Sequence, residues 1–282
     1  MSTNESPQKQ DRSADSRFLI DLARAFGGAL FFSLPMLMTM EMWWLGFYMD
    51  RLRLALLLFL AVPVLTILSY HAGFEETFRW QEDLQDAFVA LAVGFASAAG
   101  ILFLLDIVTA DTSLDDAIGK VGIQAIPGSI GAMLARTQLG GGKAQPRERR
   151  ESHRYLGELF LMGVGAVYLA LNVAPTEEML LLSYKMSGWH TVALALVSML
   201  LLHAFVYAVE FRGHATVPEG TPLWSVFLRF TVVGYAVALL ISLYLLWTFG
   251  RLEGTAVFET IEAVFVLGFP AALGAAVARL VL

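Results

Sequence analysis

The chain has 282 residues and contains no cysteine. Disulfide bonds, iron–sulfur clusters and zinc sites built on thiolates are therefore excluded. Charged residues are also scarce, at 16% of the sequence, where soluble domains carry about 25%. The phosphate-binding Gly-Lys-Ser/Thr loop, the H-E-x-x-H and G-x-S-x-G motifs and the T-V-G-Y-G filter of K⁺ channels are missing too. Because no nucleophile–base set is visible, we expect no enzyme, and no cofactor other than a bound cation.

Apolar residues, in contrast, make up 57% of the chain, and the mean hydropathy is +0.64. They concentrate in eight blocks of the length that crosses a bilayer, which is about 20 residues. This pattern predicts an all-α membrane protein with eight transmembrane helices. The expected spans are 26–49, 54–72, 87–105, 117–135, 156–184, 191–209, 223–249 and 256–281.

The fourth span is the weakest, because it contains Lys120, Gln124 and four glycines, and alone it could form a re-entrant hairpin. Charge placement favours a full span. The segment 136–154 carries six Lys and Arg against two Glu, and the N-terminal flank is also basic. Both segments are cytosolic by the positive-inside rule only if an even number of spans separates them. We therefore expect four spans between them and both termini in the cytosol, although Arg51 and Arg53 on the outer side oppose this.

The two halves of the chain resemble one another. Residues 41–74 align with 178–211 without a gap, and the Pro-containing segment 126–136 matches 269–279. Two copies of four spans each would have the same orientation, related by a pseudo-twofold axis along the membrane normal. The expected organisation is a disordered tail (1–16), a first repeat (17–136), a basic cytosolic linker (137–153) and a second repeat (154–282). The first 16 residues are polar and do not form a signal peptide.

The motif T-x-E-M occurs once in each half, as residues 39–42 and 176–179. Both copies lie inside an expected span, and an ionisable group at bilayer depth is costly and usually functional. Glu41 and Glu178 could approach one another across the pseudo-twofold axis. Paired carboxylates can hold a proton or a hard cation such as Ca²⁺ or Na⁺. The other reading is structural: each glutamate hydrogen-bonds a neighbour and fixes helix packing.

Further oxygen ligands lie next to these glutamates. They are Thr39, Thr176, Asn172 and Glu177. The threonines join the site only if the helix is broken there. Pro175 would break the second copy and free backbone carbonyls, which can coordinate cations where they line a cavity. Pro35 would do the same in the first copy, at a different spacing. Glu177 is either a second ligand or a charge at headgroup level.

Several other residues are candidates with a structural alternative. Asp106, His203, Tyr70 and Tyr207 could line a pathway, and Pro127 and Pro270 could act as hinges. The alternatives are a solvated helix end for Asp106, hydrogen-bonded packing for His203, the aromatic belt for the tyrosines and kinked packing helices for the prolines.

After residue 17 the chain resembles a family of prokaryotic integral membrane proteins, on the T-x-E-M copies and the stretch 171–178. That family implies a location in the inner membrane but no particular activity. The stretch 171–178 is also similar to the repeat motifs of cation/Ca²⁺ exchangers, where an acid lies at a helix break. This chain departs from those motifs in its smaller span number, its parallel repeats and the missing Asn of its first copy.

Together these features predict a cation- or proton-conducting channel or transporter with a paired glutamate site, Glu41 and Glu178. The expected partners are the lipid bilayer and small cations; a homo-oligomer stays open, and nucleic acid is not expected. The alternative is a membrane scaffold or sensor that transports nothing, in which the buried glutamates fix helix packing or oligomerisation.

Overall fold

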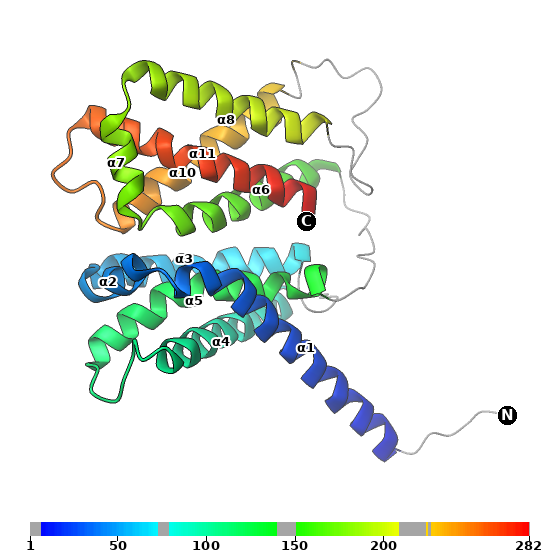
Figure 1. The fold of residues 1–282 in the computed structure, drawn as a ribbon. Helices are drawn as coiled ribbons and strands as arrows, with labels where there is room; N and C mark the ends of the chain where they lie inside the picture. The colour runs from blue at the N-terminus through cyan, green and yellow to red at the C-terminus, as the bar shows by residue number, and fades with distance from the viewer. Residues whose placement is uncertain (1–6, 73–78, 140–150, 209–223, 225–226, 282) are drawn as a thin grey trace. The chain divides into compact units, whose positions relative to one another are not determined.

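The computed structural model describes residues 7–72, 79–139, 151–208, 224 and 227–281. Every element that it assigns there is a helix (Figure 1). The elements are α1 (Pro7–Leu37), α2 (Met40–Tyr48), α3 (Arg51–Ala72), α4 (Trp80–Leu104), α5 (Leu114–Leu139), α6 (Glu151–Val173), α7 (Glu177–Lys185), α8 (Gly188–Ala208), the π-helix η1 (Phe227–Val232), α10 (Val233–Thr248) and α11 (Val257–Val281). The predicted all-α class is confirmed.

Eight of the helices in the described part of the chain are long and apolar enough to cross a membrane. Their apolar parts are Leu19–Leu37, Arg51–His71, Trp80–Leu104, Leu114–Ala135, Tyr155–Val173, Gly188–Phe205, Phe227–Thr248 and Val257–Ala278. The fourth, expected to be the weakest, is one continuous helix and the most buried of the eight. The hairpin alternative for it is therefore wrong.

The expected bounds of the first and fifth spans are also wrong. Residues 26–49 and 156–184 are not single helices, because α1 ends at Leu37 and α6 at Val173. A helix of nine residues, α2 or α7, follows each break. Hydropathy missed both breaks because apolar residues continue after each of them, as in residues 42–48 and 179–182.

The N-terminal tail differs from the expectation as well. Residues 7–16, expected to be disordered, continue α1 as a helix from Pro7, and residues 1–6 lie outside the described residues. The segment contains good helix formers such as Gln, Lys, Arg and Ala, which extend a helix that the apolar residues already nucleate. The linker is described only at its ends, because α5 runs to Leu139 and α6 starts at Glu151.

The chain divides into two compact units, which are described separately. One comprises Met1–Met38 and Leu58–Ala144, the other Thr39–Leu57 and Gln145–Leu282. The short helix α2 and the start of α3 thus belong to the same unit as α6 to α11. Both copies of T-x-E-M lie in this second unit.

In the first unit α1, α4 and α5 pack around small residues. A Cβ added to Gly28 of α1 would clash with the Gly131 carbonyl and lie 2.7 Å from the Cβ of Ala135, both on α5. A Cβ on Gly94 of α4 would clash with the Ala125 carbonyl of α5 in the same way. Small residues allow this close approach, which replaces the hydrophobic driving force that helices lack in lipid.

In the second unit α11 packs against α6, α7, α8 and α10, and α6 lies beside it in Figure 1. A Cβ on Gly165 of α6 would clash with the Gly274 carbonyl of α11 and approach the Cβ of Ala278 closely. This contact resembles that of Gly28 with Gly131 and Ala135 in the first unit. The two glycine pairs lie on the first long helix and the last long helix of each half.

The ends of α4 and α10 also share one geometry. At the end of α4 the backbone N–H of Leu105 donates to the Ile101 carbonyl and that of Asp106 to the Phe103 carbonyl. The N–H of Ile107 donates to the Leu102 carbonyl. The end of α10 repeats this pattern 144 residues later, with Gly250 at the position of Asp106. Both residues have a positive φ, 60° and 70°. The structure thus pairs Asp106 with Gly250.

Candidate functional site

Both T-x-E-M motifs begin a short helix that follows a break. Thr39 is the N-cap of α2 (φ −99°, ψ 118°), and Thr176 is the N-cap of α7 (φ −73°, ψ 143°). Neither threonine caps its helix through its side chain. Glu41 and Glu178 are therefore the second residues of their helices, in the first turn. The helix break that the threonines need in order to join the site is present in both copies.

This placement corrects the expected depth of the glutamates. The spans end at Leu37 and Val173, so Glu41 and Glu178 lie beyond a span and not in its middle. Glu41 is partly buried, and Glu178 is exposed. A carboxylate in the first turn also interacts favourably with the helix dipole. Neither glutamate therefore lies inside one of the segments of spanning length.

The break before α7 has its own hydrogen bonds. The hydroxyl of Thr176 donates to the Val173 carbonyl at 2.8 Å, and the side-chain amide of Asn172 donates to the Tyr168 carbonyl at 2.8 Å. The carbonyl of Pro175 accepts a hydrogen bond from the guanidinium of Arg251. A positive side chain therefore binds one of the backbone carbonyls at this break. Carboxylate, hydroxyl and amide oxygens remain as candidate ligands.

The break in the first copy is not at the expected proline. Helix α1 continues through Pro35 and ends two residues later, so the break lies at Met38–Thr39. A proline removes the hydrogen bond to the carbonyl four residues earlier, so it weakens the turn before it and does not fix where the helix ends. The second break lies at Pro175, as expected, between α6 and α7.

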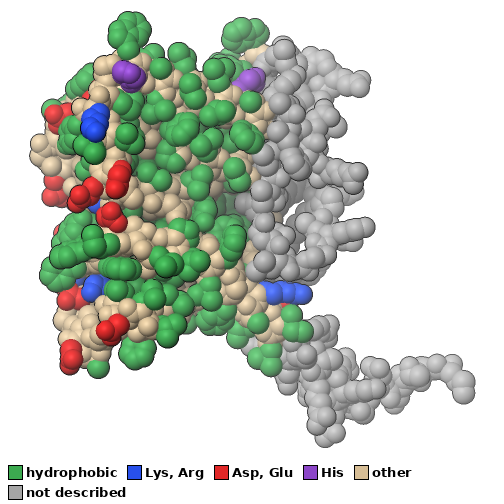
Figure 2. Space-filling model, in the orientation of Figure 1, with side chains coloured by type: hydrophobic (Ala, Val, Ile, Leu, Met, Phe, Trp, Pro, Cys, Tyr) green, Lys and Arg blue, Asp and Glu red, His purple; other side chains and the backbone are tan. Residues whose placement is uncertain are grey.

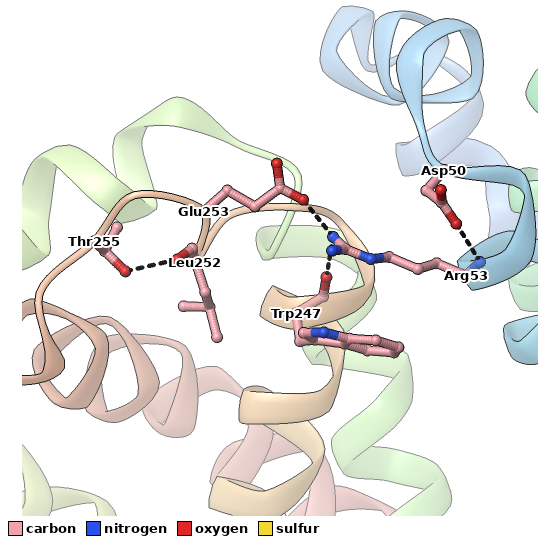
Figure 3. Close-up of polar contacts among 6 residues, drawn as sticks. All are labelled: Asp50, Arg53, Trp247, Leu252, Glu253 and Thr255. Carbon is pink, nitrogen blue, oxygen red and sulfur yellow. Dashed lines mark hydrogen bonds and ion pairs between the residues drawn. The ribbon is translucent and has the colours of Figure 1, made fainter.

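A network of charged residues joins the start of α3 to the α10–α11 connection within the second unit (Figure 3). The guanidinium of Arg53 lies 2.8 Å from the Glu253 carboxylate and donates to the Trp247 carbonyl at 2.9 Å. Its carbon atom lies 4.9 Å from the centre of the Trp247 ring, a cation–π contact. The carboxylate of Asp50 caps the start of α3 by accepting from the Arg53 backbone N–H at 3.0 Å. Arg51 and Arg53, which opposed the expected orientation, are thus engaged near helix ends.

Two buried acids were missed by the sequence reasoning, Asp83 in the first turn of α4 and Glu262 of α11. Glu262 lies in the apolar segment Val257–Ala278 of α11 and is only 6% exposed. It is therefore more deeply buried than either Glu41 or Glu178. The sequence itself could have indicated Glu262, because Glu259 and Glu262 are two acids about one helical turn apart at the start of the eighth apolar segment. The carboxylate of Glu259 accepts from the Ala256 backbone N–H at 3.1 Å, as a capping residue does. Of Glu259 and Glu262, only Glu262 is buried.

The remaining candidates lie apart from the T-x-E-M motifs in the chain and have local contacts. Asp106 is exposed in the turn after α4, and Tyr70 is exposed beside His71. His203 bonds the buried hydroxyl of Thr231 in η1, with 2.9 Å between Nδ1 and Oγ1. The side chain of Tyr207 lies outside the described residues. Pro127 and Pro270 lie inside the continuous helices α5 and α11.

A metal role for Glu41 and Glu178 stays a prediction. Among the described residues no three or more His, Asp or Glu side chains form a group that could hold a metal ion. A pair of carboxylates with hydroxyl and amide oxygens is a different donor set, and it suits hard cations.

The surface defines the class of protein. In Figure 2 hydrophobic side chains are spread over the whole described part of the surface, and in each unit Asp and Glu gather toward the end with the α4–α5 or α10–α11 connection. Large hydrophobic side chains such as Phe59, Leu104 and Trp189 are 71%, 77% and 84% exposed, which is typical of a surface that contacts lipid. With eight helices of spanning length in the described chain, this is a multi-pass integral membrane protein.

The chain belongs to the family described as "Putative integral membrane protein (DUF2391)", whose match covers residues 21–282. The family expected from the sequence is therefore confirmed. No curated protein and no solved structure matches the chain.

Proposed function

We propose that this protein is a cation- or proton-conducting channel or transporter, in which Glu41 and Glu178 form a paired acidic site. The observation that supports it most is the repeated geometry of the T-x-E-M motif. In both copies an extended threonine ends a break, and a glutamate lies in the first turn of a nine-residue helix. Both helices belong to the same unit. Broken helices with acids beside them are typical of ion sites in transporters.

The proposal includes an internal duplication of the chain. It is supported by the order of the helices, because a long helix, a nine-residue helix and a long helix begin both halves. The glycine contacts of α1 with α5 and of α6 with α11, and the shared ends of α4 and α10, support it further. Equivalent elements of two parallel copies would then place equivalent acids at the same membrane boundary.

The mechanism would be electrostatic. Carboxylates at the mouth of a pathway raise the local concentration of cations and exclude anions. A cation that enters between two carboxylates would offset the repulsion between their negative charges. Asn172, Thr39, Thr176 and Glu177 would supply further oxygen ligands.

The experiment is ion flux into proteoliposomes, across a panel of cations and pH gradients. We expect the flux of one cation, or of protons, to exceed that of empty vesicles. Glu41→Gln and Glu178→Gln should each reduce it several-fold, while Asp111→Asn, which removes an exposed acid elsewhere, leaves it unchanged. Flux that is equal in wild-type protein and both glutamine variants would contradict the proposal.

A scaffold or sensor is the second candidate, and one observation favours it. An acid in the first turn of a helix is stabilising there without any ligand, and this applies to both glutamates. In that case Glu41→Gln and Glu178→Gln lower the melting temperature or change the oligomeric state, and ion flux stays at the level of empty vesicles. Because Glu178 is exposed, it does not fix helix packing as a buried side chain would.

The orientation belongs to the same proposal. We place the protein in the inner membrane of a prokaryote with both termini in the cytosol, because eight spans are an even number and the segment 136–154 is basic. Cysteine accessibility tests this directly, since the natural chain has no cysteine. Single cysteines at residues 3 and 145 should react only after the membrane is permeabilised, and one at Asp111 should react from outside.

A further inference from the structure

Gln124 is a polar residue at the centre of the membrane. It is the eleventh of the 22 residues in the apolar segment Leu114–Ala135 of α5, and its exposure is 0%. At 1.5 Å per residue, it lies about 15 Å from either end of that segment. This is half the thickness of a bilayer's hydrocarbon core, which is about 30 Å.

Neither amide atom of Gln124 has a hydrogen-bond partner among the described residues. The side chain can donate two hydrogen bonds and accept two. Lipid chains offer no partner at this depth, so a polar group there must be satisfied from within the protein. Other buried polar side chains of this unit are satisfied: Ser33 donates to the Ala29 carbonyl at 2.6 Å and Ser129 to the Ala125 carbonyl at 2.7 Å.

Ser97 of α4 is a second unsatisfied group, and the helix register places it in the same layer. Its hydroxyl is buried and also lacks a partner among the described residues. A Cβ on Gly128 of α5 would lie 3.3 Å from the Cα of Gly94 of α4, so these two residues face one another. Ser97 lies about one turn after Gly94 on α4. Gln124 lies about one turn before Gly128 on α5. Because α4 and α5 are antiparallel, both steps go in the same direction (Figure 1).

From this layer we infer an internal binding site for water within the first unit, formed by the amide of Gln124 and the hydroxyl of Ser97. The two groups together offer donors and acceptors but no formal charge, which suits a small neutral molecule that both donates and accepts. Water meets this requirement, and buried waters typically bind otherwise unsatisfied polar groups. The site is separate from the glutamates and does not depend on the proposed transport.

The second half of the chain offers a natural comparison. In the alignment of 126–136 with 269–279, the position of Gln124 corresponds to Leu267, which is also fully buried. A leucine therefore fits between helices of this kind. The glutamine is a specific feature of the first unit and is not required for packing.

The test is nuclear magnetic resonance of protein in lipid nanodiscs, with ¹⁵N in the side-chain amides of glutamine. The Gln124 signal is assigned as the one that Gln124→Leu removes. We expect its amide protons to show cross-peaks to water, and Ser97→Ala to shift the signal and weaken them. Cross-peaks to aliphatic protons alone, with none to water, would overturn the inference.

Thermal unfolding provides an independent measurement. If water satisfies the amide, Gln124→Leu removes those hydrogen bonds and leaves Ser97 without its partner, so the melting temperature falls. Gln85→Leu, at an exposed position of α4, is the control for a gain in hydrophobicity. A higher melting temperature for Gln124→Leu than for wild type would indicate a dry, unsatisfied amide and would refute the site. Ser97→Ala, which adds no volume, serves if the leucine variant does not fold.

Discussion

Gly165→Ala should separate α6 from α11, the two helices that meet most closely in the second unit. The new Cβ would overlap both the Gly274 carbonyl and the Cβ of Ala278, which would lie 2.5 Å away. Both partners are rigid parts of α11, so no flexible side chain can move aside. The helices themselves would have to move apart.

The size of the effect follows from the geometry. Non-bonded heavy atoms rest about 3.5–4.0 Å apart, so the helices would separate by roughly 1 Å. A gap of this size loses between about a quarter and a half of the dispersion energy at the contact. Overpacking a close contact typically costs about 1–3 kcal/mol. Alanine is favoured over glycine in a helix by about 1 kcal/mol, which offsets part of this cost.

Gly163→Ala is the matched control, two residues away on the same helix. A Cβ there meets only side chains at ordinary distances, 3.7 Å from Val237 and 3.8 Å from Ile241. The helix propensity term is the same in both variants, so their difference isolates the packing term. We therefore expect Gly165→Ala to be less stable than Gly163→Ala by about 1–3 kcal/mol.

The assay is reversible unfolding in bicelles with increasing denaturing detergent. The double variant Gly165→Ala/Gly274→Ala should cost less than the sum of its single variants, because the helices are already apart after the first change. Equal stability of Gly165→Ala and Gly163→Ala would refute the close contact and the reasoning from it.

Three further outcomes are expected in the same assay. Glu253→Gln should cost up to about 1 kcal/mol and less at high salt, because the Glu253 side chain that pairs with Arg53 is 69% exposed. Arg53→Ala should cost more, roughly 1–2 kcal/mol, since the Trp247 contacts are lost as well; equal costs would show that these contacts contribute nothing. Gly250→Ala should destabilise by about 1–2 kcal/mol because its φ is positive, whereas Gly100→Ala, with open space around it, should be neutral or stabilising. A neutral Gly250→Ala would show that the turn after α10 adapts.

The candidate site could be predicted in part. Residue type and repetition were sufficient to single out Glu41 and Glu178, and Pro175 indicated one break correctly. The break after α1 was placed at Pro35 instead of Met38–Thr39, since a proline does not tell where its helix ends. Glu262 was overlooked because it is near the end of a span, where charges are common. Whether a side chain there is buried depends on the helices packed against α11.

What the sequence by itself determined is the class of the protein: its apolar blocks match the thickness of a bilayer, a property of composition and length that no packing detail alters. The tertiary structure decided where the blocks break and which small residues meet, as Gly28 does with Gly131 and Gly165 with Gly274. It also decided that Gln124 faces inward at the membrane centre. These features depend on helix rotation and register. Hydropathy carries little information about them, because lipid-facing and protein-facing residues of a membrane helix are almost equally apolar.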